Sequence, residues 1–284
     1  MLQDIRIIPT QYRDMEPTKV LYHNNCNDGF AAAYCAWTVL GDSVQYIGVN
    51  HGEEPPTINQ GDRVYVVDFS YSREIMLSIE KIASELVVLD HHKTAQEALL
   101  GLSFANFNMN KSGAVLAWEY WRPNEPVPTL IQYVQDRDLW NKKLSFCDQV
   151  DAMLRSFKME FEVWDNLAHL SSEEYLSLAQ TLGNPILEKK QRDVEALAST
   201  YTWTEIGGYK VPTVETSKSG VVSDLGHYLC KTIPEAPFAA ILCVTQDGKT
   251  FCGLRSVGDF DVSEIAKQFG GGGHKNAAGF ERVS

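Results

Sequence analysis

Apolar and polar residues follow one another along the chain in blocks that predict alternating strands and helices. The apolar runs typical of buried strands are residues 19–25, 43–50, 62–70 and 85–92. Residues 29–41 and 72–84 lie between them and carry the patterns of helices, the first of which should stop at Gly41. Strands that alternate with helices over short connections predict a mostly parallel sheet with helices on both faces.

The middle of the chain is predicted to be helical. Helices are expected over 112–121, where Ser112 is placed as the cap, and over 127–140. From 151 to 200 the pattern stays helical but becomes polar, and Pro185 is expected to interrupt it. This stretch is typical of helices that bridge two domains.

After residue 201 the pattern of short strands begins again. Expected strands lie within 202–216, 238–248 and 250–257, and expected helices cover 222–230 and 261–269. A second, smaller α/β domain follows from this pattern. The predicted organisation is a first domain over 18–165, a helical linker over 166–200 and a second domain over 201–284, with an irregular lead-in over 1–16.

The composition is that of a globular protein that can bury a sizeable core. The 284 residues are 44% hydrophobic and 22% charged, and the net charge is −12. That charge argues against a broad basic groove for nucleic acid, because phosphate contacts need Lys and Arg. It fits a metalloenzyme whose carboxylates are partly neutralised by cations, and it fits an acidic, soluble surface, which is the more common reason for such a charge.

The cysteines and the apolar runs bear on the setting in which the protein works. Six Cys are spread singly without a C-x-x-C pair, which argues against a zinc ribbon. The first ten residues mix acid and base, and no apolar run approaches the length of a membrane span, so neither a signal peptide nor a membrane partner is expected. A reducing, cytoplasmic setting with free thiols is the expectation.

Acidic and imidazole side chains follow the predicted strands at the points where the strands end. They are His23 and Asp28 after the first, Asp68 in the third, Asp90, His91 and His92 at the end of the fourth, and Asp136 and Asp138 in a later helix. One such Asp is often only a helix cap or a turn residue. Because parallel strands share one carboxyl edge, where ligands bind in open α/β sheets, the whole set predicts a common site.

Asp and His together favour hard to borderline divalent ions, whereas zinc sites lean on Cys and His. A carboxylate that bridges two ions forms a two-metal site, which activates a water and clamps phosphoryl oxygens. Mn²⁺, with two ions and Mg²⁺ as the alternative, is therefore the expected cofactor. The adjacent His91 and His92 divide naturally into one ligand and one residue that faces the substrate.

The sequence GGGGHKNAAGF, residues 270–280, lies between a predicted helix and a final strand rather than between domains. Glycines there let the backbone approach a ligand and present N–H groups to phosphate oxygens. The expected substrate contacts are Arg255, Ser256, Gly271, Gly272, Gly273 and His274. Arginine suits bidentate phosphate contact, and His274 could contact a phosphate or a base.

The sequence VLDHH ending at His92, the acid-bearing first strand, the isolated Asp68 and the glycine-rich C-terminal motif together resemble the DHH phosphoesterase superfamily in its DHH–DHHA1 branch. The resemblance runs from about residue 18 to the end. That family contains RecJ-type exonucleases, nanoRNases, phosphatases of pAp, cyclic dinucleotide phosphodiesterases and exopolyphosphatases. The resemblance implies Mn²⁺- or Mg²⁺-dependent hydrolysis of a phosphoester or phosphoanhydride bond, with the second domain binding substrate.

The resemblance also implies roles for individual residues. The metal ligands would be His23, Asp28, Asp68 as the bridging carboxylate, His91, and Asp136 with Asp138 as its rival. His92 would lie beside the scissile phosphate, and Asp90 would orient a histidine. Cys26 stands where the family has the first acid of a D-x-D pair, so either Cys26, Asn25 or Asn27 contributes a ligand, or Cys26 is an unreactive small residue.

These observations predict a two-domain, metal-dependent phosphodiesterase that acts on short oligonucleotides or dinucleotides. A longer basic track would be needed by a processive exonuclease, so no long duplex is expected as a partner. The alternatives are an exopolyphosphatase, a pAp-type phosphatase, and a nucleotide-sensing module with a weakened metal site. The chain is compatible with a homodimer.

Overall fold

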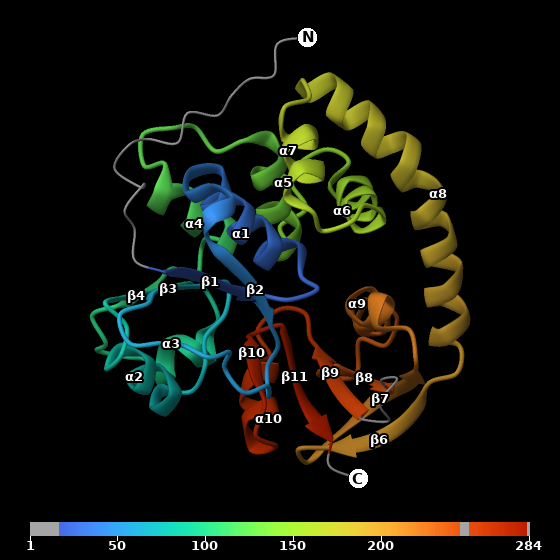
Figure 1. Cartoon of the computed structure of the whole chain (residues 1–284). Helices are drawn as coiled ribbons and strands as arrows, with labels where there is room; N and C mark the ends of the chain where they lie inside the picture. Colours follow the sequence, from blue (N-terminus) through green and yellow to red (C-terminus); the bar gives the residue numbers. More distant parts are fainter. Residues whose placement is uncertain (1–16, 245–249, 283–284) are drawn as a thin grey trace. The chain divides into compact units, whose positions relative to one another are not determined.

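The computed structural model of the protein describes residues 17–244 and 250–282 (Figure 1). The lead-in expected over 1–16 lies outside these residues. Of the strand expected over 238–248, the last four residues lie outside them. The chain divides into two compact units, residues 1–184 and 185–284. The domain bounds expected from the sequence stay a prediction.

The first unit is built on a five-stranded sheet in which every neighbouring pair is parallel, as predicted. The strands in spatial order are β2 (Gln45–Val49), β1 (Thr18–His23), β3 (Arg63–Val67), β4 (Glu85–Asp90) and β5 (Ala105–Phe107). The short edge strand β5 was not expected, because three residues are too few to show a period.

Helices cover both faces of this sheet, which explains why the middle parts of its central strands are apolar (Figure 1). On one face lie α1 (Asn27–Leu40), α4 (Gly113–Trp121), α5 (Thr129–Asp138), α6 (Cys147–Ser156) and α7 (Phe161–Ala168). The other face carries α2 (Arg73–Glu80) and α3 (Lys93–Ala98). Val20 packs toward the first group and Leu21 toward the second, and both side chains are fully buried.

The helix α8 (Ser172–Ala198) is continuous for 27 residues and contains Pro185. The interruption expected at that proline is therefore wrong. Tyr175 and Ala179 are buried in the core of the first unit, while Val194 and Ala198 are buried in the core of the second. Because packing fixes the helix on both sides of the proline, the one backbone hydrogen bond that proline removes does not end it.

The second unit is a smaller α/β unit with a six-stranded mixed sheet, and the fold class expected from the sequence is confirmed. Its strands in spatial order are β10 (Gly272–His274), β11 (Ala277–Arg282), β9 (Thr250–Arg255), β8 (Ala239–Val244), β7 (Tyr209–Thr216) and β6 (Thr202–Ile206). Only β7 and β8 pair in parallel. The helices α9 (Val222–Thr232) and α10 (Val262–Gln268) pack on opposite faces. Short 3₁₀ turns cover Gly41–Ser43 (η2) and Ser219–Val221 (η3).

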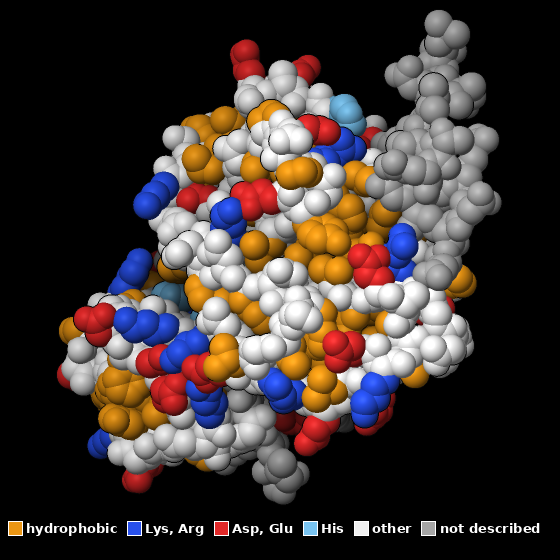
Figure 2. Space-filling view, turned by 90° about the vertical axis from the view of Figure 1, so that its left-hand side faces the viewer, with side chains coloured by type: hydrophobic (Ala, Val, Ile, Leu, Met, Phe, Trp, Pro, Cys, Tyr) orange, Lys and Arg blue, Asp and Glu red, His pale blue; other side chains and the backbone are white. Residues whose placement is uncertain are grey.

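Two surface properties agree with the composition. Within residues 17–244 and 250–282, none of the helices combines the length and apolarity needed to cross a membrane. On the face drawn in Figure 2, basic side chains are scattered among acidic and apolar ones.

Candidate metal centre

Three neighbouring strands of the first unit end at the same level. The register pairs Tyr22 of β1 with Val67 of β3, and Val67 with Leu89 of β4. The residues that follow are His23, Asp68 and Asp90. Alignment of the strand ends therefore brings the polar side chains predicted from the sequence to one edge of the sheet, where α/β proteins bind ligands.

Asp68 leaves β3 in a backbone conformation that few residues adopt. Its φ is 53°, in the left-handed region, and its N–H donates to the carbonyl of Leu89 at 2.9 Å. Gly113, the first residue of α4, packs so closely that a Cβ there would lie 2.4 Å from the Cβ of Asp68. The fold thus holds the Asp68 carboxylate in place by a strained backbone and a glycine contact, and such strain is found mainly at functional sites.

One nitrogen of His91 faces three carboxylates. Its Nε2 lies 3.1 Å from Asp68 Oδ1, 3.5 Å from Asp28 Oδ2 and 3.4 Å from Asp138 Oδ2. His91, Asp28 and Asp68 are almost fully buried, and the Asp138 side chain is 26% exposed. Buried carboxylates that converge in this way repel one another unless positive charge lies between them.

The electrostatics of these groups reflect that crowding. Burial and the charges of Asp68 and Asp138 raise the pKa of Asp28 well above its usual value. Burial disfavours the charged ring of His91, but the hydrogen bond to Asp68 and the Asp138 carboxylate raise the pKa of His91 to about 11. Burial likewise opposes ionisation of Asp68, yet His23 and His91 hold the pKa of Asp68 well below its usual range. The site therefore demands cationic charge, which either protonated imidazoles or metal ions can supply.

Asp28 has a second set of partners at the start of α4. Its Oδ2 accepts from the N–H of Gly113 at 2.6 Å, and its Oδ1 accepts from the N–H of Ala114 at 3.0 Å. A carboxylate is stabilised at a helix N-terminus by the unpaired amides and the helix dipole. Asp28 thus joins α1 to α4 and faces His91 at the same time.

The structure distinguishes Asp136 from Asp138. The Asp136 carboxylate accepts from the backbone N–H groups of Lys143 and Leu144 at 3.0 and 2.9 Å, so it fastens the loop after α5. Asp138, the last residue of α5, is the one that lies beside His91. The geometry therefore favours Asp138, the rival left open by the sequence, over the predicted Asp136.

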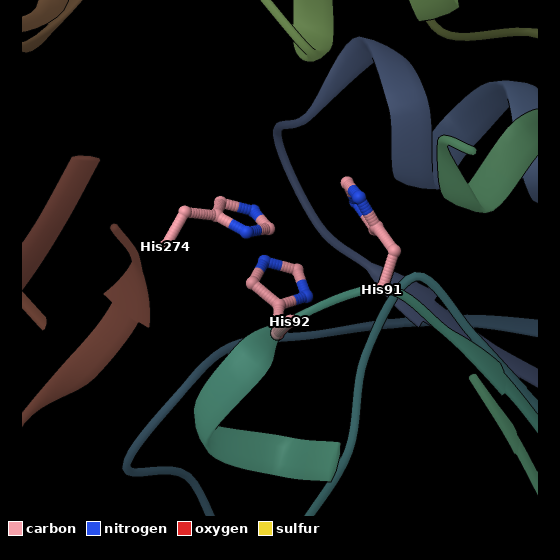
Figure 3. A group of neighbouring side chains, drawn as sticks. All are labelled: His91, His92 and His274. Atoms are coloured by element: carbon pink, nitrogen blue, oxygen red, sulfur yellow. The ribbon is translucent and has the colours of Figure 1, made fainter. Parts of the chain in front are cut away.

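His92 is held by the buried carboxylate of Asp90. The Nδ1 of His92 lies 2.7 Å from Asp90 Oδ1, and Asp90 Oδ2 accepts from the hydroxyl of Ser70 at 2.7 Å. Burial opposes the charge on Asp90, but His92 lowers the pKa of Asp90 to about 2. Figure 3 shows His91 and His92 leaving the end of β4, with His92 at the start of α3. Asp90 contacts the ring of His92, and its role in orienting that ring stays a prediction.

A second group of ligand-type atoms lies beside the first. The side chains of His23, Cys26 and Asp68 place one donor atom each within 4.8 Å of one another. Nδ1 of His23 and Oδ2 of Asp68 are 3.5 Å apart, and neither atom makes a hydrogen bond within the described residues. Their contact with each other is an ion pair without a hydrogen bond, so both atoms have bonding capacity left for a ligand.

The residues present fit divalent ions. One atom each of Asp28, His91 and Asp138, two carboxylate oxygens and an imidazole nitrogen, lie within 4.8 Å of one another; Asp28 and His91 are buried and Asp138 faces solvent. Such donors suit Mn²⁺ and Mg²⁺. Asp68 lies next to both groups, through His91 on one side and His23 on the other, which is the place a bridging carboxylate would take.

Sequence reasoning missed several residues that surround this centre. His51, which follows β2, stacks on Phe69 at 4.6 Å between ring centroids and lies 5.4 Å from the ring of His23. The rule used for the other strands, a polar side chain directly after a strand end, could have found it. Buried Asp151 accepts from Asn27 at 3.1 Å and lies 3.3 Å from Arg137, so it ties the turn of Cys26 and Asp28 to α5. No sequence pattern signals that contact, because 124 residues separate Asn27 from Asp151.

The predicted substrate contacts of the second unit are largely engaged within that unit. The Arg255 guanidinium donates to the hydroxyl of Ser223 and to the carbonyl of Leu254, both at 2.8 Å. Ser256 is 1% exposed, donates to the Phe260 carbonyl at 2.7 Å and accepts from Asn276 at 2.9 Å. Both residues therefore stabilise the fold, and their role in substrate binding stays a prediction.

Strand pairing within the second unit explains glycines of the segment 270–280 without reference to a ligand. Gly272 and His274 belong to β10, which pairs with β11. A Cβ at Gly271 would lie 2.1 Å from the Gly279 carbonyl oxygen, and Gly273 has a φ of 134° beside the Ala277 carbonyl. The close pairing of these strands requires both glycines. His274, also drawn in Figure 3, comes from β10 of this second unit, and its contact with substrate stays a prediction.

Comparison with known proteins identifies relatives of both units. Residues 208–282 match the family model of the DHHA1 domain. The chain is 28% identical over 281 residues to the uncharacterized protein R106 of Acanthamoeba polyphaga mimivirus, covering 92% of this chain and 66% of that protein. It is 22% identical over 290 residues to the oligoribonuclease NrnB of Bacillus subtilis strain 168, covering 91% of this chain and 71% of that protein. The match with the mimivirus protein therefore spans just under two thirds of its length.

Solved structures share the fold. The DHH domain of a member of a ribosomal-protein family superposes with a TM-score of 0.57 at 13% identity, covering 94% of this chain and 82% of that chain. RecJ in complex with Mn²⁺ from Thermus thermophilus superposes with a TM-score of 0.50 at 14% identity, covering 96% of this chain and 50% of that chain. At these identities the likeness concerns the fold.

Proposed function

We propose that this chain, which belongs to the DHH–DHHA1 superfamily, is a divalent-metal-dependent phosphodiesterase that hydrolyses short nucleotides. The observation that carries the proposal is the convergence of Asp28, Asp68 and Asp138 on one nitrogen of His91 at the carboxyl edge of a parallel sheet. A buried, acidic site of this kind suits metal-assisted attack of water on phosphorus.

The proposed ion-binding residues are His23, Asp28, Asp68, His91 and Asp138, with Asp138 taking the place predicted for Asp136. Mn²⁺ is the proposed ion, with Mg²⁺ as the alternative. Bound ions of this type lower the pKa of a coordinated water and stabilise charge on phosphoryl oxygens. Asp68 links the two groups of donor atoms, because its Oδ1 faces His91 and its Oδ2 faces His23.

His92 is the proposed residue beside the scissile phosphate. Asp90 is ionised and lies 2.7 Å from Nδ1 of His92, so it holds the proton on that nitrogen. Nε2 is then left as the atom that exchanges a proton or contacts a phosphoryl oxygen. Ser70 in turn holds Asp90, which fixes the orientation of the ring.

The proposed substrate class is a short oligonucleotide or a dinucleotide. NrnB of B. subtilis, which aligns over 91% of this chain, carries the name oligoribonuclease. The net charge of −12 disfavours a long basic track for nucleic acid. We assign substrate positioning to the second domain, where Arg255 and the segment from Gly271 to His274 remain the proposed contacts; the Ser256 hydroxyl is already engaged within the fold.

A turnover assay tests the proposal. The full chain, freed of metal with a chelator, is mixed with Mn²⁺, Mg²⁺ or no ion and offered an RNA dinucleotide, a short oligonucleotide, a long single strand, pAp, a cyclic dinucleotide and polyphosphate. We expect hydrolysis of the dinucleotide and the short oligonucleotide with Mn²⁺, less with Mg²⁺, and none after chelation. The Asp68→Asn variant is the control for contaminating nuclease.

Other results of this turnover assay would indicate a different function. Hydrolysis of polyphosphate or pAp with no cleavage of oligonucleotides would make the chain an exopolyphosphatase or a pAp-type phosphatase. Tight binding of a nucleotide without turnover would indicate the sensing module. Full turnover after exhaustive chelation, with no metal left in the sample, would exclude the metal-dependent mechanism.

A further inference from the structure

Cys26 differs from the other cysteines in its surroundings. The five cysteines at 35, 147, 230, 243 and 252 are buried, whereas Cys26 is half-buried at the turn between β1 and α1. It occupies the N-cap position of α1, but its side chain makes no capping hydrogen bond. A thiol is also a poor cap compared with Ser, Asp or Asn, so the helix start does not explain the residue.

The Cys26 thiol lies beside side chains of the kinds that bind metal ions. The sulfur of Cys26, one nitrogen of His23 and one oxygen of Asp68 are all within 4.8 Å of one another. Ligands at about 2.0–2.3 Å from a tetrahedral ion lie about 3.3–3.8 Å apart, so the three groups need to close by at most about 1.5 Å. Rotation of the half-buried Cys26 side chain can supply a movement of that size while Asp68 stays in place.

A second observation points to a ligand at the same place. Oδ2 of Asp68 is buried without a hydrogen bond within the described residues, and the Asp68 side chain is 2% exposed. Nδ1 of His23, 3.5 Å away, is also buried without one. A buried carboxylate oxygen whose contact is a 3.5 Å ion pair without a hydrogen bond is incompletely satisfied, and an ion held between Asp68 and His23 would satisfy both atoms.

The neighbouring group has different chemistry. Asp28, His91 and Asp138 offer only oxygen and nitrogen, whereas the group of His23 and Asp68 includes sulfur. Thiolate ligands favour Zn²⁺ and similar softer ions, and carboxylates favour Mg²⁺ and Mn²⁺. The two halves of the centre are therefore not equivalent in ion preference.

We propose that Cys26 is a thiolate ligand that, with His23 and Asp68, forms a borderline-soft ion site beside a hard site formed by Asp28, His91 and Asp138. Binding forms a metal–sulfur bond and releases the thiol proton to solvent. This inference rests on the proposed function for the presence of ions at the centre. It adds that one of the two sites prefers Zn²⁺ or Co²⁺ to Mg²⁺.

Cobalt spectroscopy on the full, metal-stripped chain tests the inference without an activity assay. Co²⁺ is added in steps while bound cobalt is counted by equilibrium dialysis and absorption is recorded. We expect a thiolate-to-cobalt charge-transfer band in the near ultraviolet that saturates with one ion per chain. Cys26→Ser should abolish this band and weaken Co²⁺ binding by at least about tenfold, as expected on loss of a ligand.

Two further variants separate ligation from folding. Cys35→Ser is the matched control, since Cys35 lies in α1, which Cys26 precedes, and its sulfur donates to the Ala114 carbonyl and belongs to neither group of ligand atoms. We expect Cys35→Ser to keep the charge-transfer band. Cys26→Asp should lose the band, still bind two ions, and shift its preference from Co²⁺ toward Mn²⁺ in competition.

The outcomes that overturn the inference are distinct from failure of the proposed function. Cobalt binding without a charge-transfer band, or a band that persists in Cys26→Ser, would show that sulfur is no ligand while leaving a metal-dependent hydrolase in place. Absence of any bound ion, even at saturating Co²⁺ or Mn²⁺, would overturn both the inference and the proposed function.

Discussion

The two units differ in how fully their buried polar side chains are hydrogen-bonded. In the first unit, Asp68 has a left-handed backbone with φ of 53° and a buried oxygen without a hydrogen bond in the described residues. In the second unit, Ser256 is as deeply buried, but its hydroxyl both donates to Phe260 and accepts from Asn276. Because folded proteins normally satisfy buried polar groups, the first arrangement needs a ligand and the second is complete without one.

The largest effect that tests this contrast is expected at Asp68. Asp68→Asn keeps a residue that tolerates the left-handed backbone but removes the charge shared by both groups of donors. We expect turnover with Mn²⁺ to fall about a thousandfold, which corresponds to about 4 kcal/mol of transition-state stabilisation. Initial rates and bound metal are measured together, with Asp259→Asn, an exposed residue of the second unit, as the control. Near-normal turnover and metal content would contradict the assignment of Asp68.

The next largest effect separates Asp138 from Asp136. Asp138→Asn removes a carboxylate that faces His91, so metal affinity should fall about 10- to 100-fold while the melting temperature changes little. Asp136→Asn removes one acceptor oxygen from the loop of Lys143 and Leu144, so it should lower the free energy of unfolding by about 1–3 kcal/mol. Metal titration and thermal melting of the two variants show which of the two aspartates binds metal. A loss of metal from Asp136→Asn alone would restore the original prediction.

A smaller effect tests the second unit. Ser256→Ala leaves the Phe260 carbonyl and the Asn276 amide without this shared partner, and should lower the free energy of unfolding by about 1–3 kcal/mol. Urea denaturation measures the change, with exposed Ser199→Ala as the control. A raised KM for oligonucleotides at unchanged stability would mean that Ser256 serves the substrate rather than the fold, and the contrast between the units would fail.

The smallest effect is expected at the surface of the first unit. Lys111 pairs with Glu119 at 2.6 Å, but both side chains are about one third or more exposed. Exposed ion pairs contribute little, so Lys111→Ala should change the free energy of unfolding by less than about 0.5 kcal/mol. Metal content should stay the same, as measured by dialysis. A loss of bound metal in this variant would mean that residues beyond the strand ends contribute to the metal centre.

The parts of the molecule that sequence predicts best are those in which one physical cause dominates. The apolar runs that end in His23, Asp68 and Asp90 define the parallel sheet and its edge, because a strand buried on both faces must be apolar until it leaves the sheet. The long polar helix was also foreseeable, but its continuity through Pro185 was not. Packing of Tyr175 and Val194 far along the helix outweighs the local effect of the proline.

The choice between Asp136 and Asp138 was beyond the sequence for a geometric reason. Two residues along a helix differ by about 200° in direction, so only the position of α5 in the fold decides which carboxylate meets His91. The glycines at 271 and 273 were ambiguous for another reason. Close strand pairing and phosphate binding both require a residue without a side chain, and the sequence cannot separate them.

The position of β1 has a consequence for the newborn chain. This strand is made before β2 and β3, yet it lies between them, so one of its edges stays open until residues 63–67 have left the ribosome. An interrupted chain that ends before that point would expose an apolar strand edge and should aggregate. The proposed ion-binding residues lie between His23 and Asp138, all in the first unit. The proposal therefore places every ion-binding group in the part of the chain that leaves the ribosome before the second unit does.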